Sequence, residues 1–266
     1  MKKEKTQILL ANDDGIDAAG IRALHEELRD HYDVLVVAPL SEKSGAGCSL
    51  SLSSEMVVEK RSDGGKVWGY GIGGTPADCV KFAMTALNGY RPAFVLSGIN
   101  RGVNLGNSVF YSGTVAAAIE GTLYGIPAMA CSLGCFGHPV AYYEDAAKVV
   151  RALLPWLLKS KHEPRTLWNL NFPNRRLNEM GPIRFTSHGT SFFEDVFKLY
   201  REEEDVMIYR NVGDRMVACA RNADSDDKAW AGGNISLSLL RTDLTIPFAE
   251  DAVTKLERDL NALLTT

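Results

Sequence analysis

Long apolar runs and an excess of positive charge are both missing from this chain of 266 residues. A membrane-spanning helix needs about 20 predominantly apolar residues, and no run in the sequence approaches that length. The net charge is −4, whereas a nucleic-acid-binding face needs clustered positive charge. We therefore expect neither a membrane nor a nucleic-acid polymer as a partner.

Cysteine is also scarce, with five residues, an odd number, and no pair at C-x-x-C spacing. Disulfide frameworks use even numbers of cysteines, and structural zinc sites need four ligands. Cys131, Cys135 and His138 lie close in sequence but lack a fourth ligand, so we interpret these cysteines as buried thiols. Strand-like residues follow Met1-Lys2-Lys3 in place of a signal-peptide apolar region. A reduced, cytoplasmic protein is predicted. The other cysteines are Cys48, Cys79 and Cys219.

Short apolar runs alternate with segments of helical periodicity through the first two thirds of the chain. This alternation predicts an α/β fold with a Rossmann-like, mostly parallel sheet flanked by helices. The expected strands are 7–12, 33–39, 50–58, 66–72, 93–97, 128–133 and 167–171, and the expected helices are 18–30, 76–87, 113–123 and 141–159.

The pattern changes after about residue 180, where short β-like runs, many charges and a Gly-Gly pair follow. Helical spacing returns in the last twenty residues. We therefore predict a Rossmann-like core over 1–182, a β-rich extension over 183–246 and a C-terminal helix over 247–266.

Asn12-Asp13-Asp14-Gly15 directly follows the first predicted strand. Two carboxylates about 4 Å apart repel each other by about 4 kcal/mol at an effective dielectric constant near 20. A divalent cation turns this repulsion into attraction, and hard oxygen ligands suit Mg²⁺, Mn²⁺ or Ca²⁺. The alternative is a solvated turn, because Asp and Gly are frequent in turns.

Three further loops are rich in small, oxygen-bearing residues: 41–47 and 97–106 after strands, and 111–114 at the start of a helix. Because parallel strands bring their C-terminal ends to one edge of the sheet, we expect the loops to converge there. Ser112-Gly113-Thr114 opens a helix, whose free N–H groups and dipole favour an anion. Carboxylates beside such an anion site are typical of a metal-dependent phosphate-ester hydrolase.

With these motifs the chain resembles the SurE family of survival-protein nucleotidases. The matching segments keep the family's order across about residues 7–133, whereas the C-terminal third matches more loosely. Gly232-Gly233-Asn234-Ile235-Ser236-Leu237-Ser238-Leu239-Leu240 stands where the family usually has a Gly-Tyr-Val-Ser-x-Thr-Pro-Leu-like strand. The closer matches are Leu10-Ala11-Asn12-Asp13-Asp14-Gly15-Ile16, Val37-Ala38-Pro39 with Ser44-Gly45-Ala46-Gly47, Gly73-Gly74-Thr75-Pro76-Ala77-Asp78-Cys79-Val80, Ser97-Gly98-Ile99-Asn100-Arg101-Gly102-Val103-Asn104-Leu105-Gly106 and Tyr111-Ser112-Gly113-Thr114-Val115-Ala116-Ala117-Ala118.

The resemblance implies a 5′-nucleotidase that hydrolyses nucleoside 5′-monophosphates, and by extension 3′-monophosphates, to nucleoside and phosphate. It implies one divalent ion, Mg²⁺ or Mn²⁺, held by Asp13, Asp14, Ser44 and Asn100, with phosphate contacts from Ser112, Gly113 and Thr114. Asp13 and Asp14 are also the candidate catalytic residues, and the choice of proton acceptor between them stays open. Further candidate substrate contacts are Asn12, Lys43, Arg101 and Asn104, with solvated surface roles as the alternative for Lys43 and Arg101.

Two functions from other classes compete with this interpretation. A dinucleotide-dependent oxidoreductase fits the fold, but no G-x-G-x-x-G opens the first helix, and an acidic pair there would repel pyrophosphate. A nucleotide-binding regulator without turnover is the second rival, and the intact candidate ligands argue against it.

The terminal helix carries apolar residues at three- and four-residue steps, which is typical of a packed face. Docking on its own core is one expectation from this pattern. The resemblance implies docking on a neighbouring subunit instead, in a homodimer or a homotetramer. The residues of the stripe are Val253, Leu256, Leu260, Leu263 and Leu264.

Overall fold

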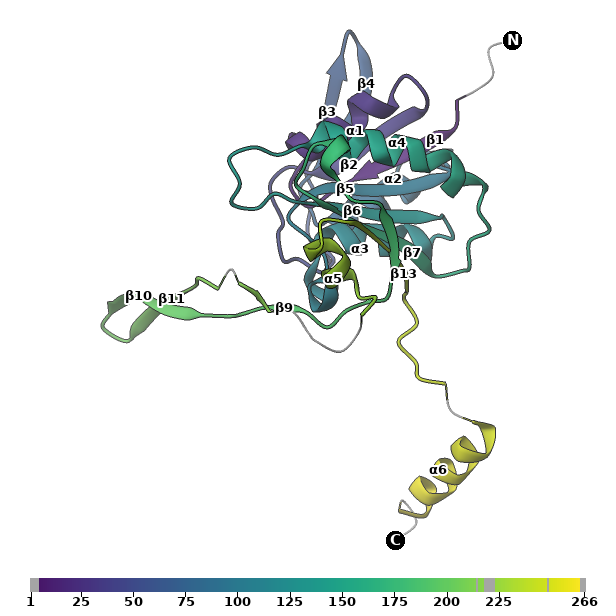
Figure 1. The fold of residues 1–266 in the computed structure, drawn as a ribbon, viewed down its shortest axis with the longest axis vertical. Coiled ribbons are helices and arrows are strands. Elements are labelled where there is room, and N and C mark those ends of the chain that lie inside the picture. Colours follow the sequence, from purple (N-terminus) through teal and green to yellow (C-terminus); the bar gives the residue numbers. More distant parts are fainter. Residues whose placement is uncertain (1–4, 214, 218–222, 248, 264–266) are drawn as a thin grey trace.

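The computed structural model describes residues 5–213, 215–217, 223–247 and 249–263, and within these a nine-stranded sheet forms the centre of the molecule (Figure 1). Its strands lie in the order β3-β4-β2-β1-β5-β6-β7-β13-β8. From β4 to β7 every neighbouring pair is parallel, and the order of these six strands is that of a Rossmann sheet. The predicted fold class is confirmed. These strands are β1 (Gln7–Ala11), β2 (Asp33–Pro39), β4 (Lys66–Ile72), β5 (Phe94–Arg101), β6 (Ala128–Gly134) and β7 (Thr166–Pro173).

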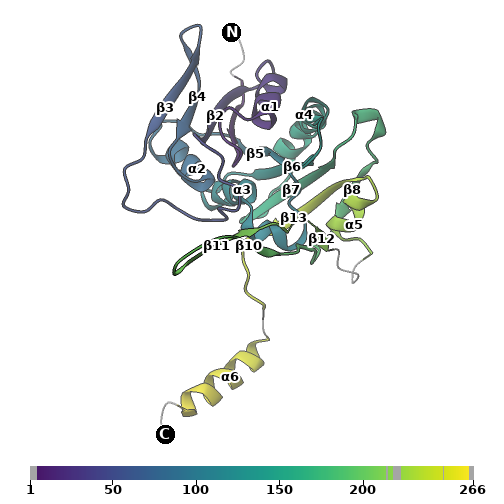
Figure 2. The ribbon, with the colours of Figure 1, turned by 90° about the vertical axis from the view of Figure 1, so that its left-hand side faces the viewer.

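Four helices cover the two faces of this sheet (Figure 2). Helix α1 packs against α4 on one face, and α2 packs against α3 on the other. Their apolar spacing explains the arrangement, since Ile21, Leu24 and Leu28 of α1 all point into the core. The four predicted helices are confirmed with small shifts at their ends. Their bounds are α1 (Ala19–Leu28), α2 (Pro76–Thr85), α3 (Gly113–Leu123) and α4 (Tyr143–Lys159).

Side chains fix the starting points of α2 and α3. The Thr75 hydroxyl accepts the N–H of Asp78 at 3.2 Å, and the Asp78 carboxylate accepts the N–H of Thr75 at 2.9 Å. This reciprocal pair is a capping box, with Pro76 in the first helical position. Ser112 caps α3 by accepting the N–H of Val115 at 3.1 Å.

The strand predicted at 50–58 is wrong. The strand that pairs with β4 is β3 (Val58–Asp63), antiparallel to it across a tight turn. Leu50 and Leu52 of the predicted strand are both exposed. Ser53 adopts a positive φ of 61°, which interrupts an extended chain.

The chain after residue 180 contributes partly to the main sheet and partly to a projection. β13 (Ile235–Arg241) pairs antiparallel with β7 and parallel with β8 (Ile183–Thr186) at the sheet edge. The hairpin of β10 (Phe197–Glu203) and β11 (Val206–Asn211) extends away from the body (Figure 1). The predicted division at residue 182 stays a prediction, although β8 and β13 complete the central sheet.

Short elements occupy the remainder of this region. β9 (Phe192–Phe193) pairs with β12 (Met216–Val217). The helix α5 (Asp226–Ala231) was not predicted, because a six-residue helix is too short to show a periodic pattern. Two 3₁₀ turns are η1 (Gly106–Tyr111) and η2 (Leu177–Glu179).

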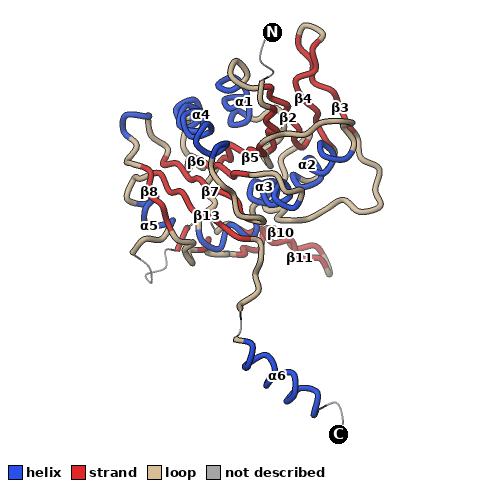
Figure 3. Tube along the Cα trace, turned by 90° about the vertical axis from the view of Figure 1, so that its right-hand side faces the viewer, coloured by secondary structure: helices blue, strands red, loops and turns tan. Residues whose placement is uncertain are grey.

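Helix α6 (Glu250–Leu263) stands apart from the rest of the molecule in Figures 1 and 3. Its apolar residues Val253, Leu256 and Leu260 are exposed. In this structure the helix therefore does not dock on its own core. Of Leu263 only the backbone is described, and residues 248 and 264–266 of the predicted segment, with the stripe residue Leu264, lie outside the described residues, as does Cys219. Among the helices that the structure describes, none has the length and apolarity that crossing a bilayer requires.

Candidate functional site

The candidate site lies where the strand order of the parallel sheet reverses, between β1 and β5. These two strands are in register, with Leu10 opposite Leu96 and Ala11 opposite Ser97. Their C-terminal ends therefore bring the loop 12–15 and the segment 97–106 to the same point. The loop predicted from residue 97 begins only after Arg101, because β5 continues to that residue. In open α/β sheets this switch point is the usual place for a ligand.

Asp13 and Asp14 form the acidic centre of this point. Asp13 is buried and Asp14 is half-buried. Burial raises the pKa of Asp13, and burial together with the charge of Asp13 raises the pKa of Asp14 to about 6. The N–H of Arg101 donates to the Asp14 carboxylate at 2.9 Å and partly opposes this shift. A nearby cation would favour the charged form of both groups.

The start of α3 packs directly against Asp13. The hydroxyl of Thr114, which has no solvent exposure, donates a short hydrogen bond to the Asp13 carboxylate. A Cβ at Gly113 would lie 2.7 Å from the Asp13 Cβ, so only glycine permits this close approach. Gly113 and Thr114 thus hold the carboxylate, whereas the sequence suggested contacts to phosphate alone. The Ser112 hydroxyl oxygen accepts the N–H of Val115, so the hydroxyl can still donate its hydrogen to another group.

The two neutral candidate ligands are Asn100, near the C-terminal end of β5, and Ser44, in the loop after β2. The amide nitrogen of Asn100 donates to the Gly102 carbonyl at 3.0 Å, which leaves the amide oxygen to act as an acceptor. Ser44 is exposed and donates to the Glu42 carboxylate at 2.7 Å. Its loop is tied to the acidic pair by the N–H of Lys43, which donates to the Asp13 carbonyl at 2.7 Å.

The other candidate substrate contacts differ in how free their side chains are. Both ends of the Asn12 amide bond to Gly15 and close the loop. The Asn104 amide nitrogen donates to the Ser132 hydroxyl at 2.8 Å, so this side chain is engaged in the fold. Arg101 is exposed and lies over the ring of Phe136, with 5.5 Å between Cζ and the ring centroid.

A cavity of about 510 Å³ joins several of these residues. Lining it are Asp13, Ser44, Asn100, Arg101, Asn104 and Ser112 of the predicted set. Asn12, Asp14, Lys43, Gly113 and Thr114 are not among its lining residues. One wall is therefore acidic and rich in oxygen, beside the start of a helix.

The cavity is also lined by aromatic and apolar side chains, which we call the aromatic wall and which sequence reasoning missed. Phe136 and His138 follow β6 at the same sheet edge, so the strand order gave a signal for them. Phe193, Met216 and Trp230 come from the chain after residue 180, where no sequence pattern pointed to the site. The ring of Trp230 lies against Gly134, and its indole nitrogen donates to the Phe172 carbonyl at 3.0 Å. Tyr111 completes this wall.

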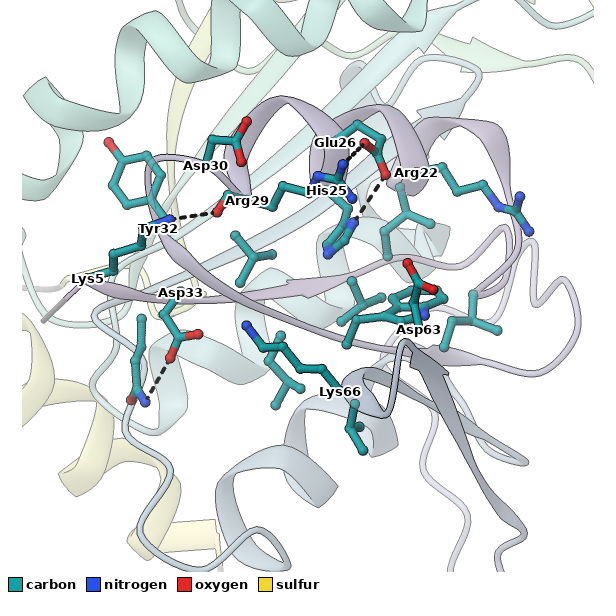
Figure 4. A pocket seen from close by; sticks show the side chains of 18 of the residues that line it. Lys5, Arg22, His25, Glu26, Arg29, Asp30, Tyr32, Asp33, Asp63 and Lys66 are labelled. Atoms are coloured by element: carbon teal, nitrogen blue, oxygen red, sulfur yellow. Dashed lines mark hydrogen bonds and ion pairs between the residues drawn. The ribbon is translucent and has the colours of Figure 1, made fainter.

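A larger cavity of about 900 Å³ lies between α1 and the β2–β4 edge, and it contains none of the predicted site residues (Figure 4). Its charged groups balance in sign, and several are paired with each other. Glu26 contacts both His25 and Arg29, and the ammonium group of Lys5 donates to the Arg29 carbonyl at 3.0 Å. We find no convergent chemistry in it.

The donor set at the switch point fits a hard divalent ion. It consists of two carboxylates with raised pKa values, one amide oxygen and one hydroxyl, and oxygen ligands of this kind suit Mg²⁺ and Mn²⁺. No group of three or more His, Cys, Asp or Glu side chains suited to a metal occurs in the described part of the chain. Cys131 and Cys135 are buried free thiols that bond to Ser97 and Tyr143.

Comparison with known proteins gives a consistent answer. A family model described as "Survival protein SurE" matches residues 8–195. The "5'-nucleotidase SurE" of Carboxydothermus hydrogenoformans is 40% identical over 245 residues, covering 90% of this chain and 91% of the relative. The "5'/3'-nucleotidase SurE" of Shigella dysenteriae is 38% identical, covering 93% and 94%. The crystal structure of the Aquifex aeolicus SurE protein superposes with a TM-score of 0.78 at 33% identity, covering 94% of this chain and 99% of that one.

Proposed function

The chain belongs to the SurE family, and from this premise we propose that it is a nucleotidase that hydrolyses nucleoside 5′-monophosphates, and also 3′-monophosphates, to nucleoside and phosphate. The observation that carries the proposal is the cavity of about 510 Å³. Its acidic wall and helix start suit a phosphate with a cation, and its aromatic wall suits a nucleoside.

The phosphate end of the substrate would face Asp13, Asn100 and Ser112. In the proposed mechanism Asp13, Asp14, Ser44 and Asn100 would hold one divalent ion. When bound, such an ion polarises a phosphoryl oxygen and makes a nearby water easier to deprotonate. The hydrogen of the Ser112 hydroxyl and the N–H groups at the start of α3, those of Gly113 and Thr114 included, would bind the phosphate oxygens. Asp13 or Asp14 accepts the proton of the attacking water.

Thr114 acts on the carboxylate in this mechanism. Its hydroxyl occupies one oxygen of Asp13, so it fixes the orientation of that side chain. Arg101 stands at the mouth of the cavity, exposed, and supplies positive charge for an anionic substrate. Lys43 contributes through its backbone N–H, which holds the Ser44 loop against Asp13.

The nucleoside would lie against the aromatic wall. Phe136 and Tyr111 expose 68% and 69% of their surface, so both rings are accessible to a base. Stacking of a base on an aromatic ring tolerates different bases and contributes about 1–3 kcal/mol. This supports a nucleotidase with broad base preference.

We further propose a homodimer or homotetramer in which α6 docks on a neighbouring subunit. The exposed apolar residues Val253, Leu256 and Leu260 support it, because an apolar stripe is normally packed. The proposed organisation keeps a core over 1–182, an extension over 183–246 and the helix segment 247–266. The cytoplasm is the proposed compartment, in keeping with free thiols at Cys48, Cys79, Cys131 and Cys135.

Phosphate release from adenosine 5′- and 3′-monophosphate, measured with and without chelator, tests the proposal. We expect release that chelator abolishes and that Mg²⁺ or Mn²⁺ restores. Binding of nucleotide without release would identify a regulator, and hydride transfer with a nicotinamide cofactor would identify an oxidoreductase. If Asn100→Ala keeps near-wild-type turnover at low metal concentration, Asn100 is not a ligand.

A further inference from the structure

Gly106 is held by residues that lie 82 to 120 positions later in the chain. Its N–H donates to the Asp226 carboxylate at 3.0 Å, and its carbonyl bonds to the His188 imidazole at 2.8 Å. The following N–H, of Asn107, donates to the Ser191 carbonyl at 2.8 Å. The loop 188–191 and the start of α5 therefore both form hydrogen bonds to the backbone at Gly106 and Asn107.

The carboxylate of Asp226 accepts hydrogen bonds from three backbone N–H groups. The residue has no solvent exposure. One carboxylate oxygen accepts the N–H of Gly106, and the other accepts the N–H groups of Gly189 and Asp227 at 3.0 and 2.8 Å. A single carboxylate thus joins α5, the loop after β8 and the start of η1. Backbone N–H bonds to an ionised carboxylate are stronger than neutral hydrogen bonds.

The contact at Gly106 leaves no room for a side chain. Its φ is +50°, and a Cβ there would lie 2.4 Å from the Ser191 hydroxyl. On the N-terminal side, Asn104 is locked to the sheet by Asn169, Asn171 and Ser132. Gly106 is therefore one of the points that fix the position of η1 relative to β5.

Gly106 lies between the two halves of the candidate site. Asn100 precedes it by six residues, and Ser112 follows it by six. We propose that Asp226 is a positioning residue for catalysis, which fixes Gly106 and so sets the distance between the Asn100 side and the Ser112 side of the cavity. The inference rests on the proposed nucleotidase function. Without the bond between Asp226 and Gly106, Ser112 shifts relative to Asn100, and the phosphate is misplaced relative to the acidic pair. A misplacement of about 1 Å costs up to about 10²-fold in rate.

Helix α5 gives this arrangement a second connection to the cavity. Trp230, four residues after Asp226, lines the cavity and bonds to the Phe172 carbonyl. The same short helix therefore holds the loop of the phosphate side and forms part of the aromatic wall.

Asp226→Asn tests the proposal, with Asp227→Asn as the matched control. Both Asp226 oxygens accept N–H groups, so an amide nitrogen must face a donor. Asp227 is equally buried, but its Oδ2 has no hydrogen-bond partner among the described residues, so an amide nitrogen there loses no bond. Gly189→Ala is a second perturbation, because its Cβ would lie 2.5 Å from the Asp226 carboxylate oxygen.

The measurements are kcat and KM on adenosine 5′-monophosphate, melting temperature, and hydrogen exchange of the peptide 102–112. We expect Asp226→Asn to lower kcat about tenfold or more, with KM changed less than threefold, and to speed exchange in that peptide. Asp227→Asn should leave both readouts near wild type. Gly189→Ala should lower kcat and speed exchange in the same way as Asp226→Asn. It replaces Asp226→Asn as the test if that variant does not fold.

Unchanged kcat and exchange in Asp226→Asn would overturn the inference. Equal losses of kcat and melting temperature in the Asp226 and Asp227 variants would also overturn it, since they would indicate a purely structural role. Failure of the proposed function is a separate result, because it appears in the wild-type protein as absent phosphate release. The role of Asp226 is tested by the ratio of the variant's kcat to that of the wild type, and by the exchange rate of the peptide 102–112.

Discussion

Two regions of the chain form the same cavity by different means. The loops of the first region follow β1 and β5, and the register of parallel strands brings them together. The second region, after residue 180, reaches the cavity through individual contacts such as Asp226 with Gly106 and Trp230 with Gly134. Sheet topology brings the loops of the first region together, whereas the second region reaches the cavity through specific side-chain contacts.

The two regions also differ in chemistry. The first supplies Asp13, Asn100 and Ser112, which are polar and mostly shielded from solvent. The second supplies Phe193, Met216 and Trp230, which are apolar or aromatic. Changes in the first region should therefore reduce turnover of every phosphate ester, and changes at the aromatic wall should distinguish nucleotides from simple esters.

The largest effect is expected for Asp13→Asn. This change removes one negative charge from the acidic pair and leaves Thr114 opposite an amide. Loss of groups that only support a metal ligand already costs about 10–100-fold, so we expect at least about a 100-fold loss of turnover. Phosphate release from adenosine monophosphate and from glycerol phosphate measures it, and both substrates should lose equally. Near-wild-type turnover with both would remove Asp13 from the mechanism.

Thr114→Val should give the next largest effect. The side chain is fully buried and close to isosteric, but it no longer donates to the Asp13 carboxylate. We expect turnover to fall about 10–100-fold, as for other groups that orient a metal ligand. Thr122→Val is the matched control on the same helix, because the Thr122 hydroxyl donates to the Ile119 carbonyl, away from the site. Equal losses in the two variants would contradict a specific role for Thr114.

Phe136→Ala should separate the aromatic wall from the acidic one. Stacking on this ring contributes about 1–3 kcal/mol, so kcat/KM for adenosine monophosphate should fall about 5–150-fold. Glycerol phosphate, which has no base, should be hydrolysed as by the wild type. Phe185→Ala is the control, because Phe185 is 69% exposed, close to the 68% of Phe136, and is not among the cavity-lining residues. A parallel loss on glycerol phosphate would show that Phe136 supports the site as a whole.

The sequence predicted the first region well, because its signals are local. Apolar runs defined β1, β2 and β5, and parallel strands place their C-terminal ends on one edge. The convergence of Asp13 with Asn100 followed from that rule. The role of Thr114 did not, since the sequence shows a polar residue at a helix start but not which carboxylate it faces.

The second region resisted prediction for a physical reason. The strand β10 is exposed along its whole length, so no alternation of buried and exposed residues marks it. The hydrogen bond between Gly106 and Asp226 joins residues 120 positions apart, and no local sequence pattern identifies two residues so far apart as partners. α5 spans fewer than two turns, so it has no periodicity to detect.

Deletion of residues 247–266 should affect assembly more than chemistry. No described side chain of α6 lines the cavity, and Val253, Leu256 and Leu260 of its apolar stripe are exposed. Light scattering should give a dimer or tetramer for the full chain and a species of about half the mass or less for the truncated chain. A full-length monomer at micromolar concentration, or an unchanged mass after truncation, would exclude α6 as the contact between subunits.

The smallest effect that we expect is a change in the thermal stability of the metal-free protein in the variant Asp14→Asn. Burial and the charge of Asp13 raise the pKa of Asp14 from 3.8 to about 6. A carboxyl group with a raised folded-state pKa stabilises the fold when protonated, so the wild type gains stability as the pH falls through about 6 towards 4. Asn mimics the neutral form at every pH.

In the presence of chelator, Asp14→Asn should therefore melt above the wild type at pH 7.5, and the difference should shrink below pH 6. The shift corresponds to about 1–3 kcal/mol, and each kcal/mol raises the melting temperature of a protein of this size by about 2–4 °C. A variant that melts below the wild type at pH 7.5 in chelator would mean that the acidic pair does not strain the metal-free site.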